Sequence, residues 1–357
     1  MDKILENEFI EFLTGRFKRS PWQKNGLQES DCELINLPGS NFIIALTTDS
    51  IVEEIERGLY SDPYMMGWMT VVVNLSDLSA AGAEPVGLLL NETLSRDLDA
   101  EFLHKLQGGI REACAEHGTY VLGGDTNFSS RMQMSGCAIG IIKDNSIITR
   151  LGCKPGDYLF STGKLGLGNS YAFLKMTGKD GDSLNPILYK PKARIKEGQL
   201  LRKYASSCID TSDGLIAATD QLMRLNNVGF VFESEIDQFI HPETLKISMD
   251  TGIPSWMFLA GIHGEFELVF TVPFEKVVPF AAAAQKAGWE PVLLGKAVNG
   301  KELRIQIDNN CITVDTTLIR NLFDKTKGQI QEYIGELFKI DQQWKSHTML
   351  QRIRKPI

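Results

Sequence analysis

Five short segments of the sequence place an aspartate beside small, hydroxyl or glycine residues. They are Ser30-Asp31, Thr47-Thr48-Asp49-Ser50, Asn74-Leu75-Ser76-Asp77, Gly123-Gly124-Asp125-Thr126 and Asp210-Thr211-Ser212-Asp213-Gly214. Mg²⁺ prefers oxygen ligands, and glycine neighbours let a backbone approach phosphate groups closely. Carboxylates that converge from different segments can hold more than one metal ion on a polyphosphate. The set therefore predicts a site for a polyphosphate and two or more Mg²⁺ ions, built without a glycine-rich phosphate loop.

Each of these motifs also has a purely structural interpretation. Asp-Gly is a common turn, and Ser-Asp is a common start of a helix. Asp77 is the most informative of the set, because the apolar pattern around it, with Val73 before it and Leu78 after it, predicts a largely buried helix. A carboxylate is rarely buried unless it is paired or binds a metal.

The elements that must position these residues follow from local patterns. Helices are predicted over 65–81, closed by Gly82, and over 99–117, closed by Gly118. A buried strand over 119–122 leads into the third motif, and a short strand over 207–209 leads into the fifth, which opens a helix over 213–225. Helices and strands interleave in both halves, so the predicted class is α/β or α+β.

Length and composition narrow the functional classes. The 357 residues suggest two domains, and the net charge of −8 argues against binding to nucleic acid, which needs a surplus of Lys and Arg. No apolar run approaches the roughly 20 residues that span a bilayer, and the N-terminus lacks the features of a secretory signal. The six scattered cysteines indicate reduced thiols, so we expect a cytoplasmic protein with no membrane partner.

The ordered motifs resemble those of thiamine-monophosphate kinase, a relative of aminoimidazole ribonucleotide (AIR) synthetase, selenophosphate synthetase and a hydrogenase maturation protein. The resemblance extends in order from about residue 25 to about residue 300. Besides the aspartate motifs it includes Ala80-Ala81-Gly82-Ala83-Glu84-Pro85, Arg150, Lys154-Pro155-Gly156-Asp157 and Thr162-Gly163.

The resemblance implies an AIR synthetase-like fold, an N-terminal domain whose strands pair across a homodimer, and a C-terminal domain covering an ATP cleft. The implied boundaries are 1–149, 150–325 and a helical tail over 326–357. The implied metal ligands are Asp31, Thr48, Asp49, Asp77, Asp125, Asp210 and Asp213. The implied nucleotide contacts are Gly124, Asp125, Arg150 and Ser212, and the implied catalytic residues are Asp210, Asp213 and Arg150. Without the resemblance, Arg150 could equally be a surface residue before a turn.

The departures from the family concern the substrate. Glu56-Arg57 stands where the family has His-Phe, and Gly264 stands where it has a glutamate, with Glu265 one position on. The family's aromatic ending is not found. Glu56 and Glu265 are therefore the candidate substrate contacts, and His263 is either a general acid–base or a structural loop residue.

Three hypotheses follow for the function. The first is an Mg²⁺-dependent transfer of the γ-phosphoryl group of ATP to a small metabolite, with thiamine monophosphate as the best single candidate. The second is phosphorylation of an amide or carbonyl oxygen that drives dehydration or ring closure. The third is a nucleotide-binding regulator without catalysis.

Overall fold

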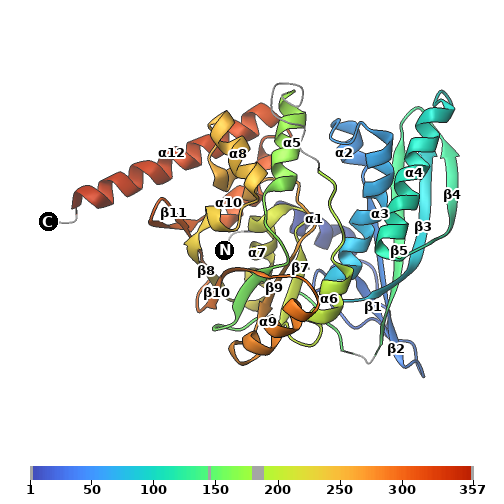
Figure 1. The fold of residues 1–357 in the computed structure, drawn as a ribbon, viewed down its shortest axis with the longest axis horizontal. Helices are drawn as coiled ribbons and strands as arrows, with labels where there is room; N and C mark the ends of the chain where they lie inside the picture. The colour runs from blue at the N-terminus through green and yellow to red at the C-terminus, as the bar shows by residue number, and fades with distance from the viewer. Residues whose placement is uncertain (1–2, 144–145, 179–188, 355–357) are drawn as a thin grey trace.

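The computed structural model describes residues 3–143, 146–178 and 189–354. Helices and strands interleave along these residues and form two mixed β-sheets with helices packed between and around them (Figure 1). This confirms the α/β class that the sequence predicts. Among the described residues, none of the helices combines the length and the apolar character needed to cross a bilayer.

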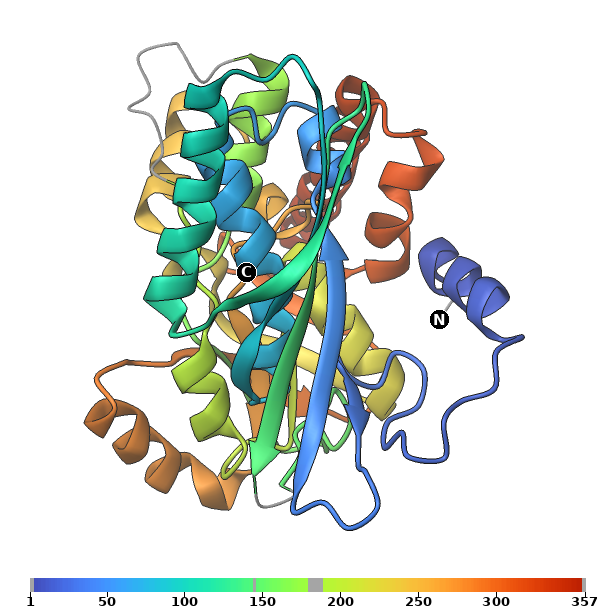
Figure 2. The same cartoon turned by 90° about the vertical axis from the view of Figure 1, so that its right-hand side faces the viewer.

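The first sheet has five strands in the order β1-β2-β5-β3-β4, in which only β3 and β4 are parallel. One face packs on α3, against which α4 lies. The opposite face, turned toward the viewer in Figure 2, is covered by no helix of the described residues. The elements are β1 (Glu33–Ile35), β2 (Phe42–Ser50), α2 (Val52–Glu56), α3 (Pro63–Ala80), β3 (Glu84–Leu94), α4 (Ala100–His117), β4 (Val121–Phe128) and β5 (Gln133–Lys143).

Helix α3 is the central element of the molecule. It begins where the Asp62 side chain accepts a hydrogen bond from the backbone of Tyr64, with Pro63 in the first turn. It contacts three strands of the first sheet and β7 of the second, so nearly all of its residues are buried. Helix α4 ends at Gly118 in the left-handed conformation. The two helices predicted over 65–81 and 99–117 are thus confirmed.

Of the residues predicted as a buried strand over 119–122, only Thr119 is buried, so the prediction of a buried strand is wrong. Strand β4 extends over Val121–Phe128 and is exposed at every residue. The reason is its position at the edge of the sheet, where it pairs with β3 alone. An apolar run reports only that a strand has apolar side chains, and does not say which surface will cover them.

The second sheet has seven strands in the order β12-β11-β8-β10-β6-β9-β7. Strand β12 follows a short turn and was not predicted. The elements are β6 (Tyr158–Ser161), α5 (Leu167–Thr177), α6 (Ile195–Leu201), β7 (Ser207–Asp210), α7 (Gly214–Asn226), β8 (Gly229–Glu235), α8 (Pro242–Thr251), β9 (Leu268–Val272), α9 (Val277–Lys286), β10 (Val292–Val298), β11 (Leu303–Ile307) and β12 (Asn310–Val314), with 3₁₀ turns at Ile236–Gln238, Ser255–Leu259 and Phe274–Lys276.

The two ends of the chain add helices at the border of this second half. Helix α1 (Leu5–Thr14) buries none of its residues and is held by hydrogen bonds such as Leu5 N to Asn321 Oδ1 (2.9 Å). Helices α10 (Thr316–Arg320) and α11 (Leu322–Lys325) lead into α12 (Ile330–Arg354). Tyr333 and Leu337 of α12 are buried in the second core, so its first half packs against the body before the helix projects outward (Figure 1).

Candidate active site

Three carboxylates from separate elements meet at the centre of the molecule. Asp31 lies in the loop before β1, Asp77 in the last turns of α3, and Asp210 at the end of β7. One ligand oxygen of each lies within 4.8 Å of the others. Like charges repel at this distance unless a cation or protons neutralise them. Oxygen ligands at this spacing are typical of Mg²⁺, so the donor set fits the predicted metal. We call these residues the aspartate trio.

Hydroxyl groups orient two members of the trio. Thr47 Oγ1 donates to Asp77 Oδ2, and Ser76 Oγ donates to Asp210 Oδ2 at 2.5 Å. Ser212 Oγ donates to the other Asp210 oxygen at 3.1 Å. Thr47 and Ser76 were not predicted as site residues, although both lie inside quoted motifs. These bonds fix the carboxylates in place while leaving lone pairs for a cation.

Arg150 binds one member of the aspartate trio through its guanidinium group. Its Nη2 donates to Asp31 Oδ1 at 2.7 Å, and its Nη1 donates to the carbonyl of Gln28 at 3.2 Å. The Gln28 backbone has a φ of 61°, which few residues other than glycine adopt. The same guanidinium lines a polar cavity of about 160 Å³ together with Ser212 and Asp213. Arg150 is therefore a partly buried residue of the site, and the surface alternative is excluded.

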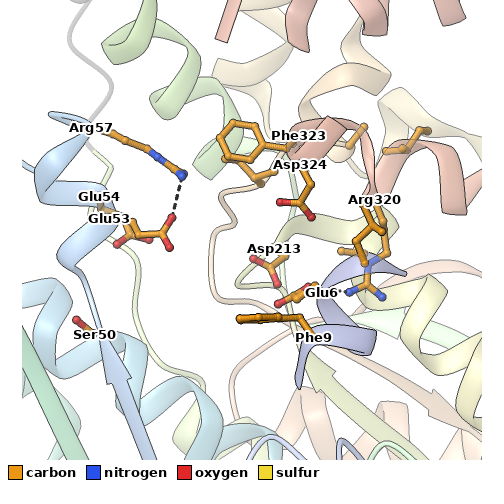
Figure 3. A pocket seen from close by; sticks show the side chains of 16 residues that line it. Glu6, Phe9, Ser50, Glu53, Glu54, Arg57, Asp213, Arg320, Phe323 and Asp324 are labelled. Carbon is orange, nitrogen blue, oxygen red and sulfur yellow. Dashed lines mark hydrogen bonds and ion pairs between the residues drawn. The ribbon is translucent and has the colours of Figure 1, made fainter. Parts of the chain in front are cut away.

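The cavity beside Arg150 adjoins a cleft of about 800 Å³, shown in Figure 3. The two spaces share the lining residues Glu6, Asp213, Ala217 and Arg320. One wall comes from α2 and the opposite wall from α1, α10 and α11. Side chains on these walls are Glu6, Phe9, Glu53, Glu54, Arg57, Arg320, Phe323 and Asp324. None of these residues was predicted to bind a ligand, because the wall is assembled from segments without a recognisable motif. Arg57 was noted as a departure from the family, and Glu53 and Glu54 were interpreted as a mostly solvated run of charges.

Three further predicted site residues, Asp213, Asp49 and Thr48, lie outside the trio. Asp213 precedes Gly214, whose φ of 80° starts α7, and its side chain enters the cleft. Asp49 lies near the end of β2, where its backbone N–H donates to Asn74 Oδ1 at 3.0 Å. The Thr48 hydroxyl donates instead to the carbonyl of Gly136 at 2.8 Å. Its hydroxyl is thus engaged with β5, while that of Thr47 reaches the trio.

Gly124 and Asp125 are not brought to the trio within this chain. They lie on the edge strand β4, which is separated from β2 by β5 and β3. Asp125 is exposed and accepts a hydrogen bond from Asn127 Nδ2 at 2.7 Å. A Cβ atom on Gly124 would lie 2.0 Å from the carbonyl oxygen of Leu90, so close packing against β3 requires glycine here.

Known proteins resemble this chain over most of its length. Residues 29–142 match the family described as AIR synthase related protein, N-terminal domain. A thiamine-monophosphate kinase from Archaeoglobus fulgidus is 30% identical over 277 residues, which cover 77% of this chain and 84% of the relative. One from Escherichia coli O157:H7 is 32% identical over 253 residues, covering 68% of this chain and 75% of the relative.

The chain belongs to the thiamine-monophosphate kinase family. It is therefore an ATP-dependent kinase by class. A solved structure described as AaThiL complexed with AMPPCP and TMP has the same fold, with a TM-score of 0.70 and 22% identity over 86% of this chain and 93% of that one. The predicted AIR synthetase-like fold is confirmed.

The two candidate substrate contacts of this family member do not line the cleft. Glu56 is exposed and lies 3.5 Å from Arg131 in an ion pair. Glu265 is buried, and its Oε2 accepts hydrogen bonds from the backbone N–H groups of Gly166 and Gly168 at 2.8 and 3.3 Å. It thus caps the start of α5. Glu53 and Glu54 of α2 face the cleft in place of Glu56.

His263 is enclosed in an aromatic cluster of this family member. Tyr60 Oη lies 3.2 Å from His263 Nε2, and the rings of Tyr189 and Phe266 pack around it. Burial lowers the pKa of His263 to about 4, which keeps the imidazole neutral near pH 7. The residue does not line the cleft, so the structure favours the structural alternative.

The carboxylates of the site have raised pKa values. Burial and then the charge of Asp31 raise the pKa of Asp210 to about 6. Burial, followed by the charges of neighbouring acids, raises the pKa of Asp49 and of Asp213 to about 7. Both residues keep solvent-exposed surface, and the solvent screens part of this effect. Burial also raises the pKa of Asp77 well above its ordinary value.

These shifts predict how Mg²⁺ should stabilise the protein at different pH values. An acid whose pKa rises on folding binds its proton more tightly in the folded state than in the unfolded state. The free energy of unfolding of the metal-free protein therefore falls as the pH rises through the folded pKa. His263 has the opposite sign, because its pKa falls on folding. The difference between unfolding free energies with Mg²⁺ and with EDTA therefore isolates the carboxylates.

We expect this difference to grow from about pH 5 to about pH 8, by roughly 1.4 kcal/mol per pH unit for each proton that the metal displaces. Chemical denaturation at fixed pH values, with Mg²⁺ or with EDTA, measures it. A difference that is independent of pH over this range would contradict metal binding by these carboxylates.

Proposed function

We propose that the protein transfers the γ-phosphoryl group of ATP to thiamine monophosphate, using Mg²⁺ ions held by the aspartate trio. The observation that carries this proposal is the trio itself, whose three oxygens lie within 4.8 Å of one another. Its member Asp210 lines the cavity of about 160 Å³ that adjoins the cleft of about 800 Å³. The relatives at 30% and 32% identity are named for this reaction. Thiamine monophosphate is a small metabolite with a phosphate as the acceptor and a cationic ring.

Asp31, Asp77 and Asp210 would hold the metal, with Asp49 and Asp213 as further ligands on the side of the cleft. Thr48 and Asp125 remain proposed ligands, Thr48 through its backbone oxygen. When bound, Mg²⁺ would neutralise the charge of the polyphosphate. The chain contributes positioning, since Ser76, Thr47 and Ser212 fix the carboxylates by hydrogen bonds.

Arg150 is the proposed group that stabilises negative charge on the transferred phosphoryl group. Its guanidinium is pinned by Asp31 and Gln28, and it borders the cavity that Asp213 shares with the cleft. A cation fixed before the reaction stabilises developing charge without reorganisation. Ser212, which lines the same cavity, is a proposed nucleotide contact, together with Gly124 and Asp125.

The cleft has the charge and the aromatic surface that a cationic acceptor needs. Its lining includes five carboxylates, Glu6, Glu53, Glu54, Asp213 and Asp324, against the two guanidinium groups of Arg57 and Arg320. Phe9 and Phe323 present rings to the same space (Figure 3). Aromatic faces and carboxylates both attract a cation such as a thiazolium ring. The walls from α1 and α11 thus supply the aromatic surface that the altered ending of the sequence did not reveal.

Exposed apolar residues on β3 and β4 support the proposed homodimer. Leu89 of β3 and Val121, Leu122 and Phe128 of the edge strand β4 are between 43% and 53% exposed. A second copy of the chain that pairs along this edge would cover these side chains. Asp125 lies on the same edge strand, so dimerisation would enclose it. A monomer by light scattering at micromolar concentration would contradict this proposal.

We retain the division at residues 149 and 150 and the helical tail from 326 as proposals about domain organisation. The tail would stabilise the second half through Tyr333 and Leu337. A cytoplasmic location is also proposed, and it is supported by six cysteines that are all free thiols.

The test is an assay of the purified protein with ATP, Mg²⁺ and thiamine monophosphate. We expect ADP and thiamine diphosphate in equal amounts, and no product when EDTA replaces Mg²⁺. ADP released only with another metabolite would replace this proposal with the phosphorylation of an amide or carbonyl oxygen. ATP binding without turnover on any substrate would identify a regulator.

A further inference from the structure

Arg57 lies over the ring face of Phe323 at the border of the cleft. The residue follows the last turn of α2, and its guanidinium carbon lies 4.7 Å from the centre of the Phe323 ring on α11. Its Nη2 also lies 2.8 Å from Glu53 Oε2. Figure 3 shows the side chain reaching from one wall of the cleft toward the other. The contact therefore joins segments 266 positions apart (57 and 323) across the mouth of the cleft.

Few contacts hold Arg57 in this position. Its partner Glu53 has a side chain that is 72% exposed, and exposed ion pairs of this kind contribute little to stability. Arg320, the other cation of the lining, differs from it. Arg320 is bound to the fully buried Asp220 at 3.1 Å and to Gln221 at 3.1 Å, so it is a fixed part of the fold. Arg57 is thus the cation of the lining that can leave its place.

The surroundings of Arg57 favour a cation at this point. Glu53 and Glu54 line the same wall of the cleft as Arg57, and Asp324 lies on the opposite wall beside Phe323. Glu54 Oε2 is buried without a hydrogen-bond partner in the described structure. A buried carboxylate oxygen without a partner is costly, and a bound cation or donor would satisfy it. The charge of Arg57 favours the ionised form of Glu54, but Arg57 forms its ion pair with Glu53 and leaves Glu54 Oε2 without a hydrogen bond.

We propose that Arg57 is a placeholder for the cationic ring of the acceptor, which displaces it from the face of Phe323 when it binds. The inference rests on the proposed function, because it takes thiamine monophosphate as the acceptor. The acceptor can bind to the face of Phe323 only after Arg57 has left it. The apparent affinity for the acceptor therefore equals the intrinsic affinity multiplied by the fraction of molecules in which this face is free. Arg57 thereby selects against neutral acceptors, which gain too little from the ring to displace it.

Four variants test the placeholder. Arg57→Ala removes it and should lower the KM for thiamine monophosphate about threefold, with kcat little changed. Arg57→Lys, which keeps the charge but not the flat guanidinium, should lie between Arg57→Ala and wild type. Phe323→Leu removes the shared face and should raise this KM about tenfold. Arg16→Ala is the matched control, because Arg16 lies over the Phe12 ring at 5.6 Å but outside the cleft, and it should leave the KM unchanged.

The KM values for ATP, measured in the same series, should stay constant, and melting curves verify that each variant folds. A raised KM for thiamine monophosphate in Arg57→Ala would show that Arg57 binds the acceptor directly, and would overturn the placeholder. An unchanged KM in both Arg57→Ala and Phe323→Leu would overturn it as well. Absence of thiamine diphosphate with the wild-type protein is a separate result, since it removes the proposed function itself.

Discussion

Replacing Asp77 by asparagine should reduce Mg²⁺-dependent phosphoryl transfer about a thousandfold, and should raise the melting temperature of the metal-free protein. The amide keeps the shape of the side chain but removes one charge from the aspartate trio. A metal held on a polyphosphate would then lack one of its anionic ligands. In the absence of metal, the same change relieves repulsion between carboxylates whose oxygens lie within 4.8 Å.

The opposite directions of these two effects separate a ligand from a structural residue. Steady-state kinetics with titrated Mg²⁺ and melting curves in EDTA measure both. Asp250→Asn is the matched control, because Asp250 is exposed on α8, and it should change neither quantity. Wild-type activity in Asp77→Asn would refute the assignment of the trio, and a large loss of stability in EDTA would indicate a structural role instead.

Replacing Gly264 by alanine should destabilise the protein by about 4 kcal/mol or more, and should abolish phosphoryl transfer in whatever folded fraction remains. A Cβ atom at this position would lie 1.4 Å from the carbonyl oxygen of Thr211. Thr211 stands between Asp210 and Asp213, and Glu267 binds it through two hydrogen bonds of 2.8 and 3.0 Å. Neither backbone can withdraw without moving the carboxylates of the site.

Chemical denaturation measures the loss, and Gly108→Ala is the control. A Cβ atom on Gly108 meets no atom within 4 Å, and the residue lies inside α4, so alanine there should stabilise by up to about 1 kcal/mol. If Gly264→Ala were as stable as wild type, the close contact between these two segments would be refuted. The contact also explains why no side chain occupies position 264 here, where the family carries a glutamate.

Asp77 and Gly264 illustrate a conflict between stability and function. The site holds several carboxylates close together, and burial, followed by the charges of neighbouring aspartates, raises the pKa values of Asp77 and Asp210. The backbone segments behind them are packed so tightly that only glycine fits at position 264, next to the backbone of Thr211. Rigid packing of the supporting backbone keeps mutually repelling groups in place until a cation binds.

Local patterns predicted those parts of the fold that depend on local interactions. Helix α4 begins at Asp99, whose side chain accepts from Phe102 N at 2.7 Å, and it ends at Gly118, as expected from the residue types at its two ends. Strand β4 was wrongly expected to be buried, because burial depends on which element lies beside the strand. The same limit applies to Glu265, whose predicted substrate contact gave way to a cap on α5.

The cleft walls could not be predicted from the sequence. Phe9 lies in an amphipathic helix, Phe323 and Asp324 in a polar segment near the C-terminus, and neither segment has a motif for ligand binding. Their part in the cleft arises only because α1 and α11 pack beside each other, joined by Leu5 N to Asn321 Oδ1.

The sequence by itself indicated the chemistry that we propose for this protein, because the preference of carboxylates for Mg²⁺ and the ability of glycine to approach a backbone belong to the residue types. It therefore named Asp31, Asp77 and Asp210 before any contact was known. Only the tertiary structure decided that these three meet while Asp125 lies apart on an edge strand. That outcome depends on α3 lying between the two sheets, and packing between distant segments is a property of the whole chain.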